Sequence, residues 1–459
     1  MKRRRVYVIV RRMRSNRYSI AALIAAIDIW YGRAGSEPPP IVFADSTGEV
    51  VGLISKSLEK GFQPVVLYSM MTTSLVENLS TIRREIGLAR SKGAITILGG
   101  PHATGDPLGS LRLGFDYIII GEGEEVLPPL LTSIEEGLDE ARIRGVAFLD
   151  NDRACYTGRA PQVNLDDYPN FPYWRGIYAP IELTRGCVHA CLFCQVSFTQ
   201  GATPRHRSLE STLHLAEEFL RTGRRDLRFI TPNTFSYLGD GWNINLEGLC
   251  SLVEGLTRLT KRYGGRFFLG SFPSEVRPEH AAIEEAVRCI AGRVANRRVI
   301  VGAQSGSNRL LRIMHRGHTV EDVVAAVETL NAYGFTADVD VIIGFPGETR
   351  EDLEATVKLS ELLTTRYKAR IHAHYYLPLP GTPLSGVEPE RPPRDVLRRL
   401  YRLLGRGLLY GDWLNQYKLS WTMVELYQKG IIVGLKGYAS MKKCGGAPIR
   451  PCPSSPLAS

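Results

Sequence analysis

The sequence lacks any long hydrophobic segment: none of its 459 residues belongs to an uninterrupted apolar run of the length a membrane helix needs, about 18 residues. The basic start, MKRRRVYVIVRRMR, contains only a short apolar run, VYVIV, which is too short for the hydrophobic region of a signal peptide. We therefore expect a protein of the cytoplasm, without a membrane partner.

Cysteine is also scarce, with 8 in the chain. Three of them gather in the stretch TRGCVHACLFCQ, and the other five are scattered. Small secreted domains instead distribute many cysteines as a disulfide framework. The pattern predicts a reducing compartment and a metal site, with Cys250 and Cys289 as buried thiols at the core positions of helices.

Acidic residues are in the minority, and the net charge is +10. Clustered Lys and Arg would indicate a surface that binds nucleic-acid phosphates. The basic residues are dispersed, however, and acidic stretches such as GEGEE interrupt them. A solvated surface is favoured over a nucleic-acid partner.

The first part of the chain, residues 1–150, alternates strand-like and helix-like periods. VYVIV, VVLYSMM, AITILGG and FDYIIIG are β-rich, and NLSTIRREIGLARSKG is an amphipathic helix that ends at a glycine. Such alternation predicts an α/β domain on a parallel sheet, whose ligand site lies beyond the carboxyl ends of the strands. Residues 151–175 are rich in Asp, Asn and Pro and are predicted to be a linker.

A second α/β series occupies residues 176–390. Six strands are predicted, at 181–184, 227–231, 267–272, 297–304, 337–345 and 371–379, with amphipathic helices between most of them. This order predicts a (βα)6 partial TIM barrel with its chemistry at the strand ends. Residues 391–459 are predicted to form a helical C-terminal extension with a frayed tail.

The cysteine cluster follows the first strand of this series. Cys187, Cys191 and Cys194 have the spacing C-x3-C-x2-C, and thiolates are the usual ligands of iron–sulfur clusters. Structural zinc takes four protein ligands, and a fourth is offered only by His189, inside the motif, or by the distant Cys444 and Cys452. Three thiolates on a four-iron cluster leave one iron open to a ligand. This interpretation is favoured over zinc and over ordinary buried thiols.

These residues resemble the radical S-adenosylmethionine (SAM) superfamily. The three cysteines, with Phe193 before the last, match its signature, and the segments VGAQSGSNRLLRIMHRGHTVEDV, VDVIIGFPGETREDLEATV and YYLPLPGTPL resemble its fourth, fifth and sixth strands. Upstream, ILGGPHATGDP and FDYIIIGEGEE resemble the Rossmann-like cobalamin-binding domain that is commonly fused ahead of such a barrel. The resemblance therefore covers roughly residues 1–150 and 176–390.

The resemblance implies three cofactors: a [4Fe-4S] cluster on the three cysteines, SAM and cobalamin. The reduced cluster would cleave SAM to methionine and a 5′-deoxyadenosyl radical, with a ferredoxin or flavodoxin as the electron donor. It also implies SAM contacts from Phe193, Asn233, Gln304, Ser305, Ile342 and Leu377. Asn233 and Gln304 are amides where relatives commonly carry acids. No catalytic residue beyond the cluster ligands is identified.

The same resemblance implies cobalamin contacts from the strand ends of the first domain, namely Ser69, Thr72, Gly99, Gly100, His102, Gly121 and Gly123. The family fingerprint Asp-x-His-x-x-Gly is absent, so cobalt would have no histidine from that motif. A domain that keeps this fold for docking or substrate recognition is the alternative. The turn residues Gly344, Pro346, Gly347 and Glu348, and Pro380, Gly381 and Thr382, are interpreted mainly as turn formers.

Methylation of an unidentified substrate is the favoured activity, ahead of rearrangement. One alternative is a cobalamin-independent RNA-modifying enzyme of the methylthiotransferase type, which usually carries three more cysteines upstream, where this chain has only Cys155. Another is a non-enzymatic iron–sulfur sensor or scaffold. Cys444 and Cys452 could also contribute to a second cluster, although two ligands are too few.

Overall fold

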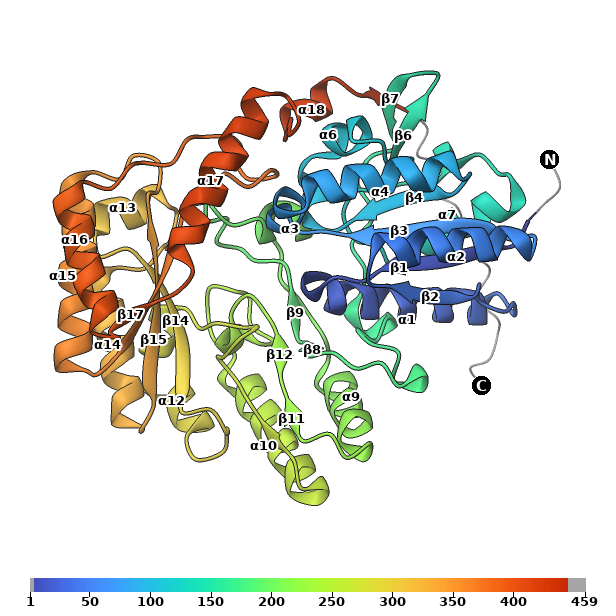
Figure 1. Cartoon of the computed structure of the whole chain (residues 1–459). Helices are drawn as coiled ribbons and strands as arrows, with labels where there is room; N and C mark the ends of the chain where they lie inside the picture. The colour runs from blue at the N-terminus through green and yellow to red at the C-terminus, as the bar shows by residue number, and fades with distance from the viewer. Residues whose placement is uncertain (1–3, 445–459) are drawn as a thin grey trace. The chain divides into compact units, whose positions relative to one another are not determined.

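The computed structural model describes residues 4–444 (Figure 1). It divides into two compact units. Unit 1 contains Met1–Ala179, Leu379–Gly381 and Glu425–Ser459, and unit 2 contains Pro180–Pro378 and Thr382–Val424. Among the helices of the described part, none combines the length and the apolar character that crossing a bilayer requires.

Unit 1 is built on a twisted sheet. Across the sheet the strands are β18 (Lys442–Lys443), β7 (Arg153–Tyr156), β6 (Val146–Asp150), β5 (Tyr117–Ile119), β4 (Ile95–Gly99), β3 (Gln63–Ser69), β1 (Val6–Arg11) and β2 (Ile41–Ala44). The strands from β2 to β5 are mutually parallel, while β6 pairs antiparallel with both neighbours. The predicted parallel α/β domain is confirmed, with an antiparallel edge.

Helices cover both faces of this sheet (Figure 1). Helices α2 (Thr47–Glu59) and α4 (Leu79–Ser91) pack on one face, and α1 (Arg17–Arg33) and α7 (Leu127–Glu136) on the other. The central strands are buried on both sides: Val65, Val66 and Leu98 have no exposed surface. Burial on both faces explains why these strands are continuous apolar runs rather than alternating ones. The short helices α3 (Thr72–Glu77), α5 (Pro101–Gly105), α6 (Pro107–Arg112) and α18 (Lys436–Ala439) complete the unit.

The segment 151–175, predicted as a linker, belongs instead to unit 1. It contributes β7 to the sheet, because Phe148 and Cys155 pair across a tight hairpin. The predicted C-terminal extension is likewise divided between the two units, since β18 adds to the same sheet through the pairing of Lys442 with Cys155. Neither segment was predicted to join the sheet, because short edge strands carry little hydrophobic periodicity.

Two disulfides join cysteines for which the sequence predicted other roles. Cys155 is bonded to Cys444, with a Cα–Cα distance of 5.6 Å, and Cys250 is bonded to Cys289, with a Cα–Cα distance of 5.7 Å. The prediction of buried thiols at Cys250 and Cys289 was therefore wrong, and Cys444 is not a ligand of a second cluster. Cys452 lies outside the described residues.

Unit 2 is an open parallel barrel. Its strands follow one another as β8 (Ile181–Glu182), β9 (Thr184–Arg185), β11 (Asp226–Leu227), β12 (Phe229–Ile230), β13 (Arg266–Phe267), β14 (Arg298–Gln304), β15 (Thr336–Ile343) and β16 (Arg370–Tyr375). Parallel pairings and isolated bridges link β8 to β12, β11 to β13, and then β14, β15 and β16. The six predicted strands occur in the predicted order. A further short strand, β17 (Leu409–Tyr410), pairs with β16.

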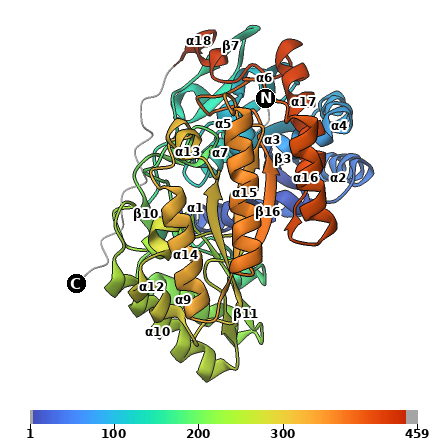
Figure 2. The same ribbon diagram turned by 90° about the vertical axis from the view of Figure 1, so that its left-hand side faces the viewer.

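Helices form the outer layer of unit 2. They are α8 (Val196–Gln200), α9 (Leu209–Arg221), α10 (Leu246–Tyr263), α11 (Pro278–Ala281), α12 (Glu284–Ile290), α13 (Asn308–Ile313), α14 (Val320–Ala332), α15 (Arg350–Arg366), α16 (Arg394–Gly405) and α17 (Trp413–Gln428). Figure 1 and Figure 2 both show α15 beside α16. With helices outside, alternate residues of each strand face the barrel interior, where the polar side chains described below lie.

Candidate metal centre and cofactor sites

The cysteine loop begins where β9 ends. Gly186 adopts φ +89°, and a Cβ there would lie 2.5 Å from the carbonyl oxygen of Thr203, so only glycine fits the turn. Cys187 donates its backbone N–H to Gly201. The Ser197 hydroxyl donates to the Cys187 carbonyl oxygen over 2.6 Å. These hydrogen bonds and the glycine turn fix the path of the backbone around Cys187.

The three cysteine side chains remain unbonded and close to one another. Cys191 is 5% exposed, and Cys187 and Cys194 are half-buried. Burial, reinforced by the charge of Cys191, raises the pKa of the Cys194 thiol to about 12, and burial also raises the pKa of Cys187. Thiolates therefore need a positive charge beside them, which a metal cluster supplies.

The spacing of the sulfurs separates a cluster from zinc. Tetrahedral zinc thiolates, with Zn–S near 2.3 Å, place their sulfurs about 3.8 Å apart. Among the described residues, the only compact set of three ligand atoms within 4.8 Å of one another is formed by Asp340, His372 and His374, so at least one pair of the cysteine sulfurs is further apart than this. Cysteine sulfurs that bind different irons of a four-iron cube stand further apart than those around a single ion. The residues present fit a [4Fe-4S] cluster.

His189, the alternative zinc ligand within the motif, is used elsewhere. Its Nε2 lies 3.1 Å from the carbonyl oxygen of Gly241, which requires Nε2–H to donate, and its ring packs edge-on against Trp242. Burial lowers the pKa of His189 to about 3, so the ring stays neutral. Its role is to anchor the cysteine loop to the segment that precedes α10.

Two arginines extend this site. Arg316, 4% exposed, donates Nη1–H to Sγ of Cys191 over 3.4 Å and Nη2–H to the carbonyl oxygen of Gly302 over 2.5 Å. Arg277 in turn donates to the carbonyl oxygen of Arg316 and to Glu279. The sequence analysis did not identify either arginine, because each reaches the site from a distant part of the chain.

Phe193 and Ile342, predicted to contact SAM, lie in one apolar cluster. Ile342 is grouped with Leu310, Met314, Phe345 and Tyr376, and Phe193 packs against this group with its ring centroid 6.5 Å from that of Phe345. The cluster borders the cysteine loop and provides an apolar surface suited to an adenine ring. Leu377, half-buried, follows directly after Tyr376.

Gln304 has an unusual backbone. It ends β14 at a bulge, with φ +71°, a conformation that residues other than glycine rarely adopt. Its side-chain amide has no hydrogen-bond partner among residues 4–444, so both polar atoms are available to a ligand. A strained residue with free polar atoms at a strand end is a candidate for ligand binding.

The polar side-chain atoms of Ser305 and Asn233, in contrast, have hydrogen-bond partners within the protein. The Ser305 hydroxyl is fully buried and lies 3.2 Å from that of Thr356. The Asn233 amide nitrogen lies 2.7 Å from Nδ1 of His280, and its oxygen accepts the backbone N–H of Arg277. Both side chains therefore support the fold of the site, and direct SAM contacts from them stay a prediction.

The turn after β15 has the structural role predicted for it. An oxygen of the buried Glu348 carboxyl accepts the backbone N–H of Gly344 over 2.7 Å. A Cβ on Gly344, at φ +76°, would lie 2.5 Å from the Tyr375 ring. Pro380 also shapes a turn: its carbonyl oxygen lies 2.4 Å from the position of a Cβ on Gly105, so glycine is required there.

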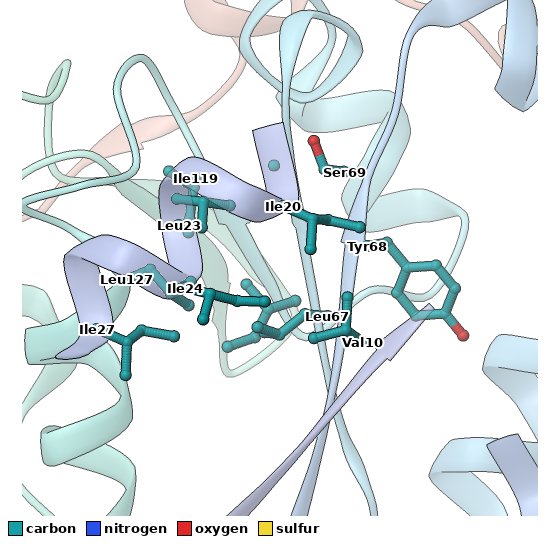
Figure 3. A pocket seen from close by; sticks show the side chains of 12 residues that line it. Val10, Ile20, Leu23, Ile24, Ile27, Leu67, Tyr68, Ser69, Ile119 and Leu127 are labelled. Atoms are coloured by element: carbon teal, nitrogen blue, oxygen red, sulfur yellow. The ribbon is translucent and has the colours of Figure 1, made fainter. Parts of the chain in front are cut away.

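In unit 1 the predicted cobalamin contacts gather at the carboxyl ends of β3, β4 and β5. Ser69 and Gly99 line a narrow apolar cavity between the sheet and α1 (Figure 3). The other walls are apolar apart from Tyr68, and the α1 side chains Ile20, Leu23, Ile24 and Ile27 close it. The Ser69 hydroxyl lies 2.8 Å from that of Ser19. The lining of this cavity is thus apolar apart from Ser69 and Tyr68.

The remaining glycines among the predicted cobalamin contacts differ in how strictly they must be glycine. Gly100 must be glycine, since at φ +95° its Cβ would lie 2.9 Å from the Met70 carbonyl oxygen, and Gly121 has φ +97°. Gly123 has less need to be glycine, because its Cβ would meet only the flexible side chain of Leu23. These positions allow a close approach of the backbone to a ligand but do not identify it.

His102 is not presented to a ligand in this structure. Its side chain is fully buried, Nδ1 lies 3.1 Å from the Thr72 hydroxyl, and Nε2 faces Asp106 at 4.0 Å. Burial lowers the pKa of His102 to about 4. Asp106 also accepts the backbone N–H groups of Val433 and Gly434, so this buried group ties α5 to the chain ahead of α18. A contact of His102 with cobalamin stays a prediction, and its interactions in this structure are structural ones.

Two family models match the chain. Residues 181–360 match the Radical SAM superfamily, and residues 52–131 match the B12 binding domain. The two matches fall in unit 2 and unit 1, respectively. The first spans the cysteine loop and β14 to α15, and the second contains Ser69, Gly99 and Gly121.

Curated relatives are moderately similar. A tRNA-2-methylthio-N(6)-dimethylallyladenosine synthase of Chromohalobacter salexigens is 32% identical over 60% of this chain, which spans 58% of that protein's length. An uncharacterized methyltransferase of Pyrococcus horikoshii is 26% identical over 72% of this chain and 70% of its own length. The chain thus spans less than two thirds of the first relative.

Solved structures share the fold. The radical SAM methyltransferase TsrM of Kitasatospora setae, with cobalamin and a [4Fe-4S] cluster bound, superposes with a TM-score of 0.62 at 19% identity, covering 83% of this chain and 74% of TsrM. The cobalamin-dependent radical SAM enzyme OxsB superposes with a TM-score of 0.59 at 17% identity, covering 78% and 52%. At these identities the likeness concerns the fold alone.

Proposed function

Because the chain is a radical SAM enzyme with an N-terminal B12-binding domain, whose cofactors are a [4Fe-4S] cluster, SAM and cobalamin, we propose that it is a cobalamin-dependent methyltransferase. The observation that carries the proposal is the set of three free cysteines on a preformed loop, with Arg316 donating to Cys191. The similarity to a methyltransferase of Pyrococcus horikoshii supports methylation over rearrangement.

The residues of unit 2 bind and orient the cofactors. Cys187, Cys191 and Cys194 would hold three irons of the cluster and leave the fourth for SAM. Phe193 and Ile342 provide the apolar surface beside it, and Gln304 provides hydrogen bonds. When bound, the cluster supplies the electron that cleaves SAM to methionine and a 5′-deoxyadenosyl radical, and cobalamin supplies a methyl carrier. The apolar surroundings keep water away from the radical.

Anaerobic reconstitution tests the proposal. The full chain should bind about four irons and four sulfides per protein, bind one cobalamin, and form 5′-deoxyadenosine from SAM under reducing conditions. Cys191→Ser should lose cluster and cleavage together. Arg312→Ala, an exposed arginine on α13, is the matched control and should keep both. A reconstituted cluster that leaves SAM intact and an electron paramagnetic resonance spectrum unchanged by SAM would favour the sensor or scaffold alternative.

The electron donor is proposed to be a ferredoxin or flavodoxin. Both are acidic one-electron carriers in general, and the net charge of +10 favours their approach. The rate of 5′-deoxyadenosine formation with such a donor should therefore fall as ionic strength rises, while the rate with a small uncharged reductant should change little.

A tRNA-modifying activity is the second candidate, favoured by the relative from Chromohalobacter salexigens and by one surface feature. Helix α16 exposes Arg394, Arg398 and Arg402 at four-residue intervals, followed by Arg406. These form one basic stripe that could track a phosphate backbone. Against it, the second cluster that such enzymes usually carry has no upstream ligands here, since Cys155 is disulfide-bonded. Steeply salt-dependent binding of transfer RNA, lost in Arg398→Ala, would favour this candidate.

A further inference from the structure

The barrel interior carries a group of titratable side chains that the sequence analysis did not identify. Asp340 on β15 and His372 and His374 on β16 alternate with the fully buried Val339 and Ala373, so they point to the opposite face from the helices. In the sheet register Asp340 pairs with His372, and Ile342 pairs with His374. His374 therefore lies beside the predicted adenine contact at Ile342, and Asp340 and His372 lie two residues, about 6.6 Å along the strands, from it.

Hydrogen bonding determines which nitrogen of His372 carries the proton. Nδ1 of His372 lies 2.9 Å from Oδ1 of Asp340. Although burial opposes ionisation of Asp340, hydrogen bonds from the two histidines outweigh it and lower the pKa of this carboxyl. An ionised carboxylate only accepts hydrogen bonds, so Nδ1 of His372 must be the donor. In the neutral ring, Nε2 is then an unprotonated base.

Nε2 of His372 is accessible. It makes no hydrogen bond with any residue in the described part of the chain. The atom is not buried, so solvent or a ligand can reach it. The side chain is 29% exposed. Tyr410 stacks on the ring, with centroids 4.7 Å apart and an interplanar angle of 13°. The ring is therefore fixed by Asp340 on one edge and by Tyr410 on one face, with its basic nitrogen open.

His374 has the opposite arrangement. The backbone N–H of Tyr375 donates to Oε1 of Gln416 over 2.8 Å, which fixes the orientation of that amide. The amide nitrogen of Gln416 then faces Nδ1 of His374 at 3.4 Å as a donor, so Nδ1 accepts and Nε2 carries the proton. Nε2 lies 3.9 Å from Oδ1 of Asp340. A protonated Nε2 directed at the carboxylate is unsuited to hold a metal ion there.

Other charges surround the group. Asp338 on β15 has its pKa raised by burial, and Arg370 on β16 lies over the ring of Tyr410 at 4.2 Å. Burial also raises the pKa of Tyr410 to about 12, so its hydroxyl stays protonated. Glu275, half-buried, interacts electrostatically with Asp340 and with Arg316, and desolvation raises its pKa. Within this group, Asp340 is thus the carboxylate kept ionised by its partners.

We propose that His372 is an acid–base residue for a substrate bound in the barrel interior, with Asp340 as the residue that positions it. The inference rests on the proposed function and extends it to a substrate class: a molecule with an O–H or N–H group next to the carbon that is methylated. An imidazole held by a carboxylate, with its other nitrogen open to a substrate, is the arrangement used in general acid–base catalysis.

His372 takes up one proton from the substrate and later returns it, so the step involves no net proton transfer. Nε2 of His372 takes the proton of the O–H or N–H group, and its bonding pair stays on the oxygen or nitrogen. The adjacent C–H bond is weakened by the new anion and would lose its hydrogen atom to the 5′-deoxyadenosyl radical, which gives 5′-deoxyadenosine. The carbon radical would take a methyl radical from methylcobalamin, and the cob(II)alamin left behind would be reduced by the one-electron donor and remethylated by a second SAM. His372 would then return the proton to the oxygen or nitrogen. The base itself consumes no oxidant or reductant.

Nitrogen NMR of the full chain labelled with ¹⁵N-histidine tests the proposal without a substrate. His372 should show a protonated Nδ1 and an unprotonated Nε2, and His374 the reverse. The signals are assigned by His372→Gln and His374→Gln, with His315→Gln, an exposed histidine, as the control. Asp340→Ala should abolish the Nδ1–H signal of His372. A His372 protonated on Nε2 in the wild type would overturn the proposal.

Metal analysis provides the second outcome. Zn²⁺ added to a Cys187→Ser, Cys191→Ser, Cys194→Ser variant should leave the histidine signals unchanged. One bound Zn²⁺ per chain, lost in His372→Gln, would replace the acid–base site by a metal site. 5′-Deoxyadenosine formation without substrate should stay within twofold of wild type in His315→Gln, the exposed control histidine. Loss of cleavage in all proteins, with the predicted histidine signals present, would instead contradict the proposed function alone.

Discussion

Arg316 donates a hydrogen bond from Nη1 to Sγ of Cys191, although 125 residues separate them in the chain. The guanidinium is buried and also donates to the carbonyl oxygen of Gly302, so the fold holds it at a fixed position beside the sulfur. A buried positive charge and a hydrogen bond both stabilise a thiolate. The potential of a cluster depends on the hydrogen bonds to its sulfurs and on nearby charge.

We therefore expect Arg316→Met to lower the reduction potential of the cluster, measured by a titration followed by electron paramagnetic resonance. The variant should also lose about 1–3 kcal/mol of stability, because the carbonyl oxygen of Gly302 is left without this donor. Arg316→Lys keeps the charge, so its reduction potential should lie between those of Arg316→Met and wild type. Arg312→Ala is the control and should match wild type. An unchanged potential in Arg316→Met would contradict a role for Arg316 in tuning the cluster.

The backbone conformation and the side-chain amide of Gln304 can be tested with two different variants. Gln304→Gly relieves a positive φ that costs other residues about 1 kcal/mol, so its unfolding temperature should equal or exceed that of wild type. The same variant removes the free amide and should weaken SAM binding by roughly tenfold, the value of one hydrogen bond. Calorimetric titration with SAM measures this affinity. Gln304→Ala should lose the same affinity without the gain in stability, and full SAM affinity in both variants would exclude the contact.

The features that the sequence predicted are local in the chain. The C-x3-C-x2-C spacing places three thiols on one loop, and the turn from Gly344 to Glu348 closes through a hydrogen bond between residues four apart. Periodicity was sufficient for the order of the strands, because each strand's pattern depends only on its own burial. The family resemblance added the cofactors, and the model matches to residues 181–360 and 52–131 agree with it.

The features that the sequence did not predict join distant segments. Arg316 meets Cys191, and Cys155 meets Cys444 across 289 residues. Asn233 was predicted to contact SAM because of its place at a strand end, yet its amide is used to hold His280. No local pattern records such pairings, since each depends on how the strands and loops pack in three dimensions.

The cavity below Ser69 and Gly99 gives a test of cobalamin binding. A Cβ on Gly99 would meet only ordinary contacts near 3.9 Å, so Gly99→Ala should fold normally. Because it narrows the cavity, it should weaken cobalamin binding, read from the visible absorption of the bound cofactor. Gly100→Ala, at φ +95° with a contact of 2.9 Å, should instead destabilise unit 1 itself. Undiminished cobalamin binding in Gly99→Ala would show that the ligand does not enter this cavity.

The disulfide between Cys155 and Cys444 should stabilise unit 1. It closes a long loop and fastens β18 to β7, so its loss should cost roughly 2–4 kcal/mol. Non-reducing peptide mapping should recover the linked pair. Cys155→Ser should lower the unfolding temperature in oxidising buffer and leave only the dependence on reductant that the Cys250–Cys289 bond contributes. Equal unfolding temperatures for wild type with and without reductant would contradict a stabilising bond.

The carboxyl of Glu348 should make stability depend on pH. Burial raises its pKa to about 8 in the folded protein, from 4.5 in the unfolded chain, so the folded state favours the protonated form. This contribution is fully present below pH 4.5 and is lost as the pH rises to about 8, because ionisation then favours unfolding. Glu348→Gln keeps the shape without the charge, so its unfolding temperature should fall less between pH 6 and pH 8.5 than that of wild type, by thermal melts. Parallel melting curves for the two proteins across this range would show that Glu348 is already ionised in the folded turn.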